Sequence, residues 1–295
     1  MPGETLVIFD YSGTLSTESV LFGRPEGLLA ELHRSGLAGL GVDDLAVFWE
    51  RIVAATWRTG STTSRGYRGV MEDAVAAMQP QPVSPQLRGR IACAVEAFAE
   101  RYFASSRLDE RWRPLLTRLS REETVRVVVA TDHYAEATDV ILRGLAQWQI
   151  PAVATREAGT GVPSGNVLVA NSADLGARKT DPAFWRQVKA RLNAADFRSV
   201  IVVDDFGRNE RQEDRYGGRD KVAKRREATA ALLGEVFAAD VKIVPFALPR
   251  GKRDRGGDVR ADDDPFGPLI ARVTAVVEAA IAREKGTARR GGKDS

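Results

Sequence analysis

Residues 5–15 read TLVIFDYSGTL, and this stretch decides the fold. The apolar run Leu6–Phe9 has the length of a fully buried strand. The run ends at Asp10, and Gly13 follows shortly, so a carboxylate stands where the strand stops. Ligands of open α/β sheets bind at the carboxyl ends of the strands, and Asp10 is therefore placed for chemistry. The alternative is a strand-ending Asp that only caps a turn.

The composition is that of an ordinary soluble globular protein. Its 295 residues suffice for a core domain and a smaller second one. The net charge of +3 is small, so a nucleic-acid partner is not expected. The single cysteine, Cys93, excludes an internal disulfide, and its Ala-rich helical surroundings predict core packing. No apolar run reaches the roughly 18 residues of a membrane span and no signal peptide is evident, so we expect a cytoplasmic protein without membrane contact.

The alternation of strand and helix stops after Leu15 and resumes near residue 121. Residues 16–120 carry helical periodicity in segments separated by Gly- and Pro-rich loops, which predicts an inserted all-helical module. Asp43-Asp44 and Ser84-Pro85 are the predicted starts of two of its helices.

Apolar strands and amphipathic helices alternate again over residues 121–248. This repetition predicts an α/β fold with a doubly wound parallel sheet, to which residues 1–15 add the first strand. Residues 249–295 are expected to form a charged loop, a helix near Leu269–Arg283 and a disordered tail.

Polar side chains follow two further strands of the predicted sheet. The strand that begins at Val125 ends at Thr131, with Asp132 and His133 directly after it. A later strand ends in the pair Asp204-Asp205. Two carboxylates at the mouth of an apolar strand repel each other unless a cation lies between them and Asp10, and Mg²⁺ prefers such hard oxygen ligands.

Taken in order, these stretches resemble the motifs of the haloacid dehalogenase-like (HAD) superfamily. Its first motif is a strand followed by Asp-x-Asp-x-Thr, of which Asp10 and Thr14 match and Ser12 replaces the second Asp. The resemblance implies a Rossmannoid core in which residues 16–120 form a helical cap. It covers the core, roughly residues 5–15 and 125–246.

The resemblance also implies roles for individual residues. Asp10 would be the nucleophile that forms an aspartyl-phosphate, while the Thr131 hydroxyl, the backbone N–H of Asp132 and the ammonium of Lys179 hold the phosphoryl group. Magnesium would be held by Asp10, the Ser12 carbonyl and Asp205, with Asp204 acting indirectly and Asn209 holding a metal-bound water.

Ser12 alters the expected mechanism, because it cannot act as the general acid and base at neutral pH. Three outcomes are open: another group such as His133 takes this role, the leaving group needs no proton, or the site turns over slowly or not at all. The residues with predicted roles in catalysis are therefore Asp10, Ser12, Thr131, Lys179 and His133.

The function expected from the resemblance is magnesium-dependent phosphoryl transfer from a small phosphorylated metabolite. A catalytically weakened phosphate-binding or regulatory protein is the alternative. A haloacid dehalogenase is a further one, since halide leaves unprotonated and Arg24, Arg51 or Arg58 is available to bind it. Phosphonate cleavage needs a cap lysine, and residues 16–120 contain none.

A basic stretch over residues 208–226 follows the acidic pair. A solvated loop and helix face is one interpretation, and a site for an anionic substrate or partner is the other. Charge reversal at Arg215 and Arg219 would weaken binding only in the second case. Neither the substrate nor the oligomeric state is predicted.

Overall fold

The computed structural model describes residues 4–192, 196–209, 219–248 and 264–291. Its centre is one six-stranded sheet in the order β3-β4-β2-β1-β5-β6, in which every neighbouring pair is parallel. This confirms the predicted α/β fold with a doubly wound parallel sheet. The strands are β1 (Glu4–Phe9), β2 (Val125–Thr131), β3 (Ala152–Ala154), β4 (Val167–Asn171), β5 (Phe197–Asp204) and β6 (Asp240–Pro245).

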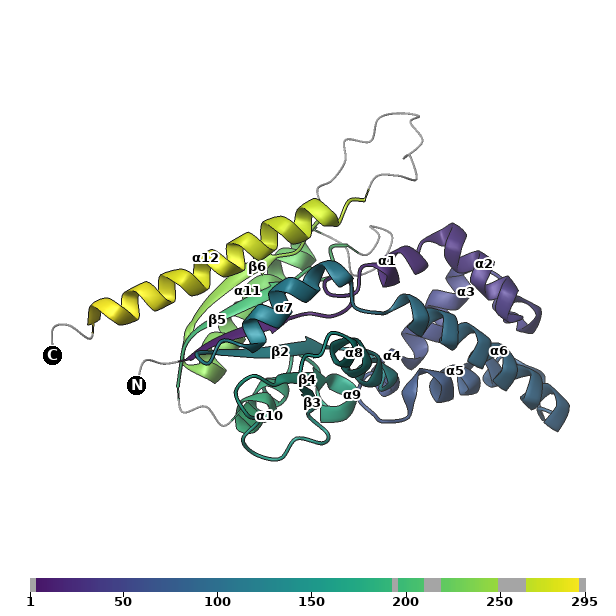
Figure 1. Ribbon diagram of the computed structural model, residues 1–295. Helices are drawn as coiled ribbons and strands as arrows, with labels where there is room; N and C mark the ends of the chain where they lie inside the picture. Colours follow the sequence, from purple (N-terminus) through teal and green to yellow (C-terminus); the bar gives the residue numbers. More distant parts are fainter. Residues whose placement is uncertain (1–3, 193–195, 210–218, 249–263, 292–295) are drawn as a thin grey trace.

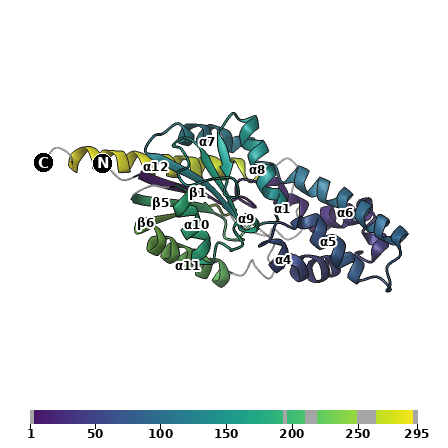
Figure 2. The same ribbon diagram turned by 90° about the horizontal axis from the view of Figure 1, so that it is seen from below.

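Helices cover both faces of the sheet, because successive side chains of a buried strand point to opposite sides. Val7 and Phe9 of β1 join one apolar cluster, and Leu6 and Ile8 join a second. Helices α7 (Arg113–Ser120), α8 (Glu136–Gln147) and α12 (Gly267–Gly291) lie on one face of the sheet, as Figure 2 shows. Helices α10 (Pro182–Leu192) and α11 (Arg219–Phe237) lie on the other face.

Every regular element of the described chain between β1 and β2 is a helix, and short turns and loops join these helices. Figure 1 shows α1–α6 grouped at the end of the sheet farthest from both chain termini. Both predicted helix starts are confirmed, since Asp44 accepts a hydrogen bond from the backbone N–H of Val47 at 2.8 Å and Ser84 from that of Leu87 at 3.2 Å. The helices are α1 (Glu18–Phe22), α2 (Pro25–Ser35), α3 (Leu45–Val47), the π-helical η2 (Phe48–Ala54), α4 (Ala55–Gly60), α5 (Gly66–Ala77) and α6 (Pro85–Ser105), with 3₁₀ turns η1 (Ala38–Leu40) and η3 (Glu110–Trp112).

Two predictions outside the sheet were wrong in detail. Cys93 is exposed rather than packed in the core, because the buried stripe of α6 runs through Ile91, Ala94 and Val95 and leaves Cys93 on the outer side. Helix α12 extends to Gly291 and so includes part of the predicted disordered tail, while most of the predicted charged loop lies outside the described residues. No helix of the described chain is long and apolar enough to cross a membrane.

The first residue of α8, Glu136, and Tyr134 in the turn before it connect the core to the helical module. The carboxylate of Glu136 accepts hydrogen bonds from the backbone N–H groups of Tyr67 at 2.8 Å and Arg68 at 3.3 Å, in the first turn of α5. The Tyr134 ring packs on that of Tyr67 with centroids 4.4 Å apart. A core carboxylate therefore satisfies the free N-terminal donors of a helix in the module.

Replacing Glu136 with Gln should lower the free energy of unfolding by about 1 kcal/mol, because the charge at the α5 N-terminus and one strong acceptor are lost. Urea denaturation of the whole chain measures this. The exposed Glu235 of α11 is the matched control, and its change to Gln should alter stability by less than about 0.5 kcal/mol. Equal effects of the two substitutions would contradict the capping role.

Candidate active site

The candidate site lies at the carboxyl ends of the three central strands. β1 lies between β2 and β5, with Phe9 paired to Val129 and to Val203. The backbone N–H of Asp10 continues this ladder by donating to the carbonyl of Val203 at 2.9 Å. Asp10, Thr131 and Asp204 consequently end their strands at the same edge of the sheet, and all three are buried.

Lys179 reaches this edge from the loop before α10. Its Nζ lies 2.6 Å from Oδ1 of Asp10 and 2.9 Å from Oδ2 of Asp204. The Lys179 backbone is held as well, because its N–H donates to Asp132 at 2.8 Å and its carbonyl accepts from the Trp185 indole at 2.7 Å. One ammonium thus joins acids that are far apart in the sequence.

The electrostatics of the site reflect burial opposed by this ammonium. Burial raises the pKa of Asp10 to about 7, although Lys179 opposes the rise. Burial also raises the pKa of Asp132, again against the attraction of Lys179. Burial alone would lower the pKa of Lys179, but the charges of Asp10, Asp204 and Asp132 outweigh it and raise that pKa well above its ordinary value. Lys179 is therefore an ammonium at neutral pH.

The two acids after β5 have different surroundings. Asp204 shares Lys179 with Asp10 and also accepts from the N–H of Phe206 at 2.6 Å. Asp205 is anchored to its own loop, where its oxygens accept from the N–H groups of Gly207 and Asn209, each at 2.9 Å. Of this pair, Asp204 bonds to the Lys179 ammonium that also holds Asp10. The resemblance instead implied that Asp205 would be the direct metal ligand.

The donor set fits a divalent cation. Asp10, Asp204 and Asp205 each offer a carboxylate oxygen, and these oxygens lie within 4.8 Å of one another. Ser12 lies in the turn directly after Asp10, and the resemblance implies that its carbonyl is a further oxygen ligand. Lys179 supplies one positive charge against three carboxylates, and a divalent ion would balance the remainder.

Asn209 has a role that the sequence analysis did not anticipate. Its Nδ2 donates to the carbonyls of Gly13 at 2.8 Å and Phe246 at 2.9 Å, and its Oδ1 accepts from the N–H of Leu248 at 2.9 Å. The side-chain amide therefore ties together the loops after β1, β5 and β6. The amide of Asn209 therefore holds backbone groups of three loops, and its contact with a metal-bound water stays a prediction.

Thr14 is a second residue whose role the sequence analysis missed. It is fully buried, and its Oγ1 accepts from the backbone N–H of Asp205 at 3.2 Å. Its carbonyl accepts from the Trp112 indole at 2.9 Å. Its place in the first motif was the available signal, but only the structure shows that it links the first motif to the acidic loop.

His133 is unsuited to act as the missing acid or base. Its Nδ1 accepts the Tyr134 backbone N–H at 2.9 Å, which leaves the neutral ring protonated at Nε2, and Nε2 lies 3.0 Å from the Tyr102 hydroxyl. Burial lowers the pKa of His133 to about 4. Both nitrogens are engaged and the ring is neutral at pH 7, so the geometry favours a structural role.

The other predicted residues occupy the expected places. Ser12 lies in the turn after Asp10, and Thr131 ends β2 and is 1% exposed. Asp132 does not cap the following helix, since α8 begins only at Glu136. Of the basic stretch, residues 210–218, which include Arg215, lie outside the described residues, and so does the side chain of Arg219.

Gly13 is required by the contact between the first motif and the acidic loop. Its φ is +79°, and a Cβ there would lie 2.8 Å from Oδ2 of Asp205. Gly13→Ala should therefore lower the free energy of unfolding by about 1–3 kcal/mol and displace Asp205. Thermal unfolding measures the effect against Gly89→Ala, which lies in α6 with open space around it and should stabilise by about 0.5–1 kcal/mol. A neutral or stabilising Gly13→Ala would contradict the close approach.

The sheet order, the helices between β1 and β2 and the acids at the strand ends agree with the arrangement that the resemblance of the motifs implied. Comparison with solved structures finds a 2-haloacid dehalogenase from Pseudomonas syringae pv. tomato DC3000, 17% identical, with 92% of this chain and 98% of that chain covered and a TM-score of 0.48. It also finds the putative HAD-hydrolase YfnB from Bacillus subtilis, bound to magnesium, 14% identical, with 69% of this chain and 78% of that chain covered and a TM-score of 0.38. No protein-family model matches the chain, and no curated protein sequence matches it either.

Proposed function

We propose that the chain is a magnesium-dependent phosphohydrolase or phosphotransferase that acts on a small phosphorylated metabolite. The observation that carries this proposal is the cluster of Asp10, Asp204 and Lys179, in which a buried carboxylate at a strand end is held by one ammonium at 2.6 Å. Such a carboxylate is oriented and partly neutralised, as a nucleophile that approaches a phosphate must be.

In the proposed reaction an oxygen of Asp10 attacks phosphorus and the ester oxygen leaves, which forms an aspartyl-phosphate. Water then attacks that phosphorus, releases inorganic phosphate and regenerates the Asp10 carboxylate. The Thr131 hydroxyl, the backbone N–H of Asp132 and the Lys179 ammonium hold the phosphoryl group. Magnesium, held by Asp10, the Ser12 carbonyl and the acids of the Asp204-Asp205 pair, would offset the charge of the transferred group.

Hydrolysis of 4-nitrophenyl phosphate tests the proposal in the presence of Mg²⁺ and after its removal with EDTA. We expect saturable turnover that depends on magnesium. Negligible turnover under both conditions, together with retained phosphate binding, would favour the second candidate, a weakened phosphate-binding or regulatory protein. The replacement of the usual acid by Ser12 is the observation that favours this candidate. Chloride release from 2-chloropropionate without metal would instead identify a dehalogenase.

Restoring a carboxylate at position 12 should raise phosphatase activity. Ser12 lies in the turn between Asp10 and Gly13 and is only partly buried, so Asp can be accommodated there. We expect Ser12→Asp to increase kcat by about 10²-fold for an alkyl phosphate, whose leaving oxygen needs a proton, and by less for 4-nitrophenyl phosphate. Ser12→Asn, similar in size but not acidic, is the control and should give no increase. An unchanged rate in Ser12→Asp would mean that protonation is not limiting.

A further inference from the structure

The turn after β2, residues 131–136, connects the proposed phosphoryl site to the helical module. At its start, the Thr131 hydroxyl and the backbone N–H of Asp132 have proposed roles in holding the phosphoryl group. The Asp132 carboxylate also accepts the backbone N–H of Lys179 at 2.8 Å. At its end, Glu136 accepts the backbone N–H groups at the start of α5. Residues 133–135 lie between these two ends, so their contacts with the module bear directly on the site.

His133 is the residue of this turn that reaches α6 of the module. Its Nε2 lies 3.0 Å from the Tyr102 hydroxyl, and the two rings stack with centroids 6.0 Å apart. Its Nδ1 accepts the backbone N–H of Tyr134 at 2.9 Å, and its own backbone N–H donates to the Ser172 hydroxyl at 3.2 Å. Because Nδ1 is an acceptor, the neutral ring carries its proton on Nε2 and donates it to Tyr102. Hydrogen bonds of His133 thus fix two successive backbone N–H groups directly after Asp132.

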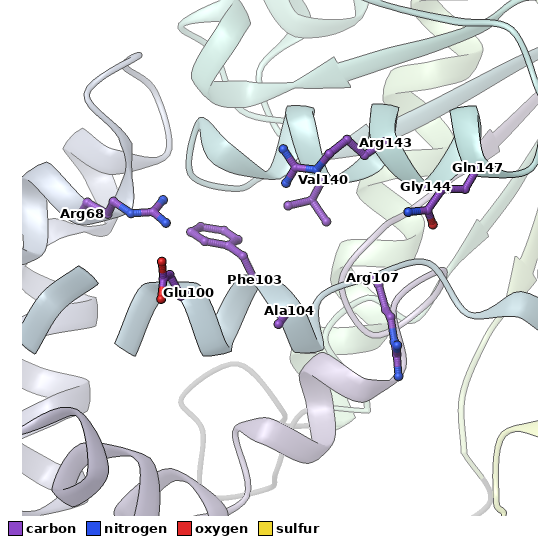
Figure 3. A pocket seen from close by; sticks show the side chains of 9 residues that line it. All are labelled: Arg68, Glu100, Phe103, Ala104, Arg107, Val140, Arg143, Gly144 and Gln147. Carbon is purple, nitrogen blue, oxygen red and sulfur yellow. The ribbon is translucent and has the colours of Figure 1, made fainter. Parts of the chain in front are cut away.

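The position of Tyr102 is set by the packing of α6 on its neighbours. The next residue, Phe103, is buried, and the Arg68 guanidinium lies 5.7 Å from its ring centroid. Figure 3 shows the Phe103 ring between Arg68 of α5 and Val140 of α8. The ring centroids of Phe103 and His133 are 6.4 Å apart. Since this packing does not use the Tyr102 hydroxyl, removal of that hydroxyl should free the His133 ring and leave α6 in place.

We propose that Tyr102 is a positioning residue of the active site, which acts through His133 on the turn that holds the phosphoryl group. A buried Nε2–H without an acceptor is unfavourable, so without the hydroxyl the His133 ring should rotate and release the N–H of Tyr134. The N–H of Asp132 would then lose its fixed direction, and hydrogen bonds weaken steeply with misalignment. The proposal rests on the function proposed above, because it concerns how that site holds its anion.

The proposed metal-binding groups are anchored separately from this turn. The three acids follow β1 and β5, and the side chains of Asn209 and Thr14 tie together the loops that carry them. Neither of these ties involves the turn after β2. Removal of the Tyr102 hydroxyl is therefore expected to weaken the binding of an anion and to leave the binding of Mg²⁺ unchanged.

Isothermal titration of the full-length chain with Mg²⁺ alone, and then with inorganic phosphate at saturating Mg²⁺, tests the proposal. Tyr102→Phe keeps the ring that stacks on His133 and removes only the hydroxyl. We expect this variant to bind phosphate at least about fivefold more weakly than wild type, with an Mg²⁺ Kd within about twofold of wild type. Its kcat/KM for 4-nitrophenyl phosphate should fall by at least the same factor as its phosphate affinity.

Tyr67→Phe is the matched control. Tyr67 lies in the same aromatic cluster, with its ring 5.6 Å from that of Tyr102, and its hydroxyl has no hydrogen bond to any residue that the structure describes. This control should leave both Kd values unchanged. Ser172→Ala removes the acceptor of the His133 backbone N–H and should weaken phosphate binding in the same direction as Tyr102→Phe. Circular dichroism verifies the fold of each variant.

Equal phosphate affinity in wild type and Tyr102→Phe would overturn the proposal. A parallel loss of Mg²⁺ affinity would also overturn it, since that result indicates a general structural change. If Tyr102→Phe does not fold, the separation of phosphate binding from Mg²⁺ binding in Ser172→Ala decides in the same way. A wild-type protein that binds no phosphate would instead contradict the proposed function, and this proposal with it.

Discussion

Asp10→Asn should abolish magnesium-dependent hydrolysis of 4-nitrophenyl phosphate. The amide keeps the shape of the side chain and an acceptor for Lys179, but it cannot form the aspartyl-phosphate. Loss of a nucleophile should reduce kcat by at least about 10³-fold, to a level set by binding and positioning alone. Initial rates at saturating Mg²⁺ measure this loss.

The same substitution should not destabilise the metal-free protein. The pKa of Asp10 is raised from 3.8 to about 7 by burial, so the folded state binds a proton more tightly than the unfolded state. The charged form of Asp10 therefore lowers stability as the pH rises from about 4 through 7. Asn carries no such charge, and the variant should have an equal or higher Tm at pH 8, with a difference that shrinks toward pH 4.

Asp240→Asn is the matched control, because Asp240 is exposed and starts β6 at the other end of the sheet. This variant should keep both the wild-type rate and the wild-type Tm. Two results would contradict the assignment of Asp10. One is turnover in Asp10→Asn within tenfold of wild type, and the other is a Tm at pH 8 that is several degrees lower.

Lys179→Met should have the largest effect on stability. Removal of the ammonium leaves Asp10 and Asp204 buried without their shared partner. It also removes the charge of Lys179 that favours the ionised form of Asp132. Breaking a buried ion pair by removing one partner costs about 3–5 kcal/mol of folding free energy. Phosphatase activity should also fall, because nothing then offsets the repulsion between Asp10 and a phosphate. Urea denaturation at pH 7.5 measures the loss of stability.

The loss should depend on pH in a definite direction. In wild type the raised pKa of Lys179 keeps its contribution throughout the range below about pH 10. In the variant the raised pKa values of Asp10 and Asp132 allow these acids to take up protons in the folded state as the pH falls. Protonation removes their repulsion, so the difference in stability from wild type should shrink between pH 8 and pH 5.

Lys189→Met serves as the control for loss of a lysine. Lys189 lies in α10, is partly buried and donates to the carbonyl of Val236 at 2.8 Å, and it has no carboxylate partner among the residues that the structure describes. Its replacement should cost no more than about 1.5 kcal/mol, with little dependence on pH. If Lys179→Met costs no more than Lys189→Met, the cluster does not hold the site together.

The strand elements of the fold were predictable because their signals are local. The apolar run Leu6–Phe9, which Asp10 follows, is too short for a helix and too continuous for a surface strand, and it forms one of the two central strands of the sheet. The alternation after residue 121 likewise required parallel strands with crossover helices. Asp10, Thr131 and Asp204 could be placed at one edge from this reasoning, because parallel strands share the direction in which they end.

Hydrogen-bond partners were not predictable in the same way. The position of Asn209 gave no indication that its amide links the carbonyls of Gly13 and Phe246 to the N–H of Leu248. Cys93 was expected inside, although the helical phase of α6 leaves it exposed. Each of these facts depends on a neighbour that arrives from elsewhere in the chain or on the exact rotation of a helix.

The amino-acid sequence by itself determined the parallel sheet, the helical insertion after its first strand and the acids at its carboxyl edge, since periodicity and strand ends are properties of short segments. Only the tertiary structure decided that Lys179 joins Asp10 to Asp204 and that His133 is neutral with both ring nitrogens in hydrogen bonds. Burial and the proximity of charges set the ionisation and the partners of a side chain, and both quantities exist only when distant segments pack against one another.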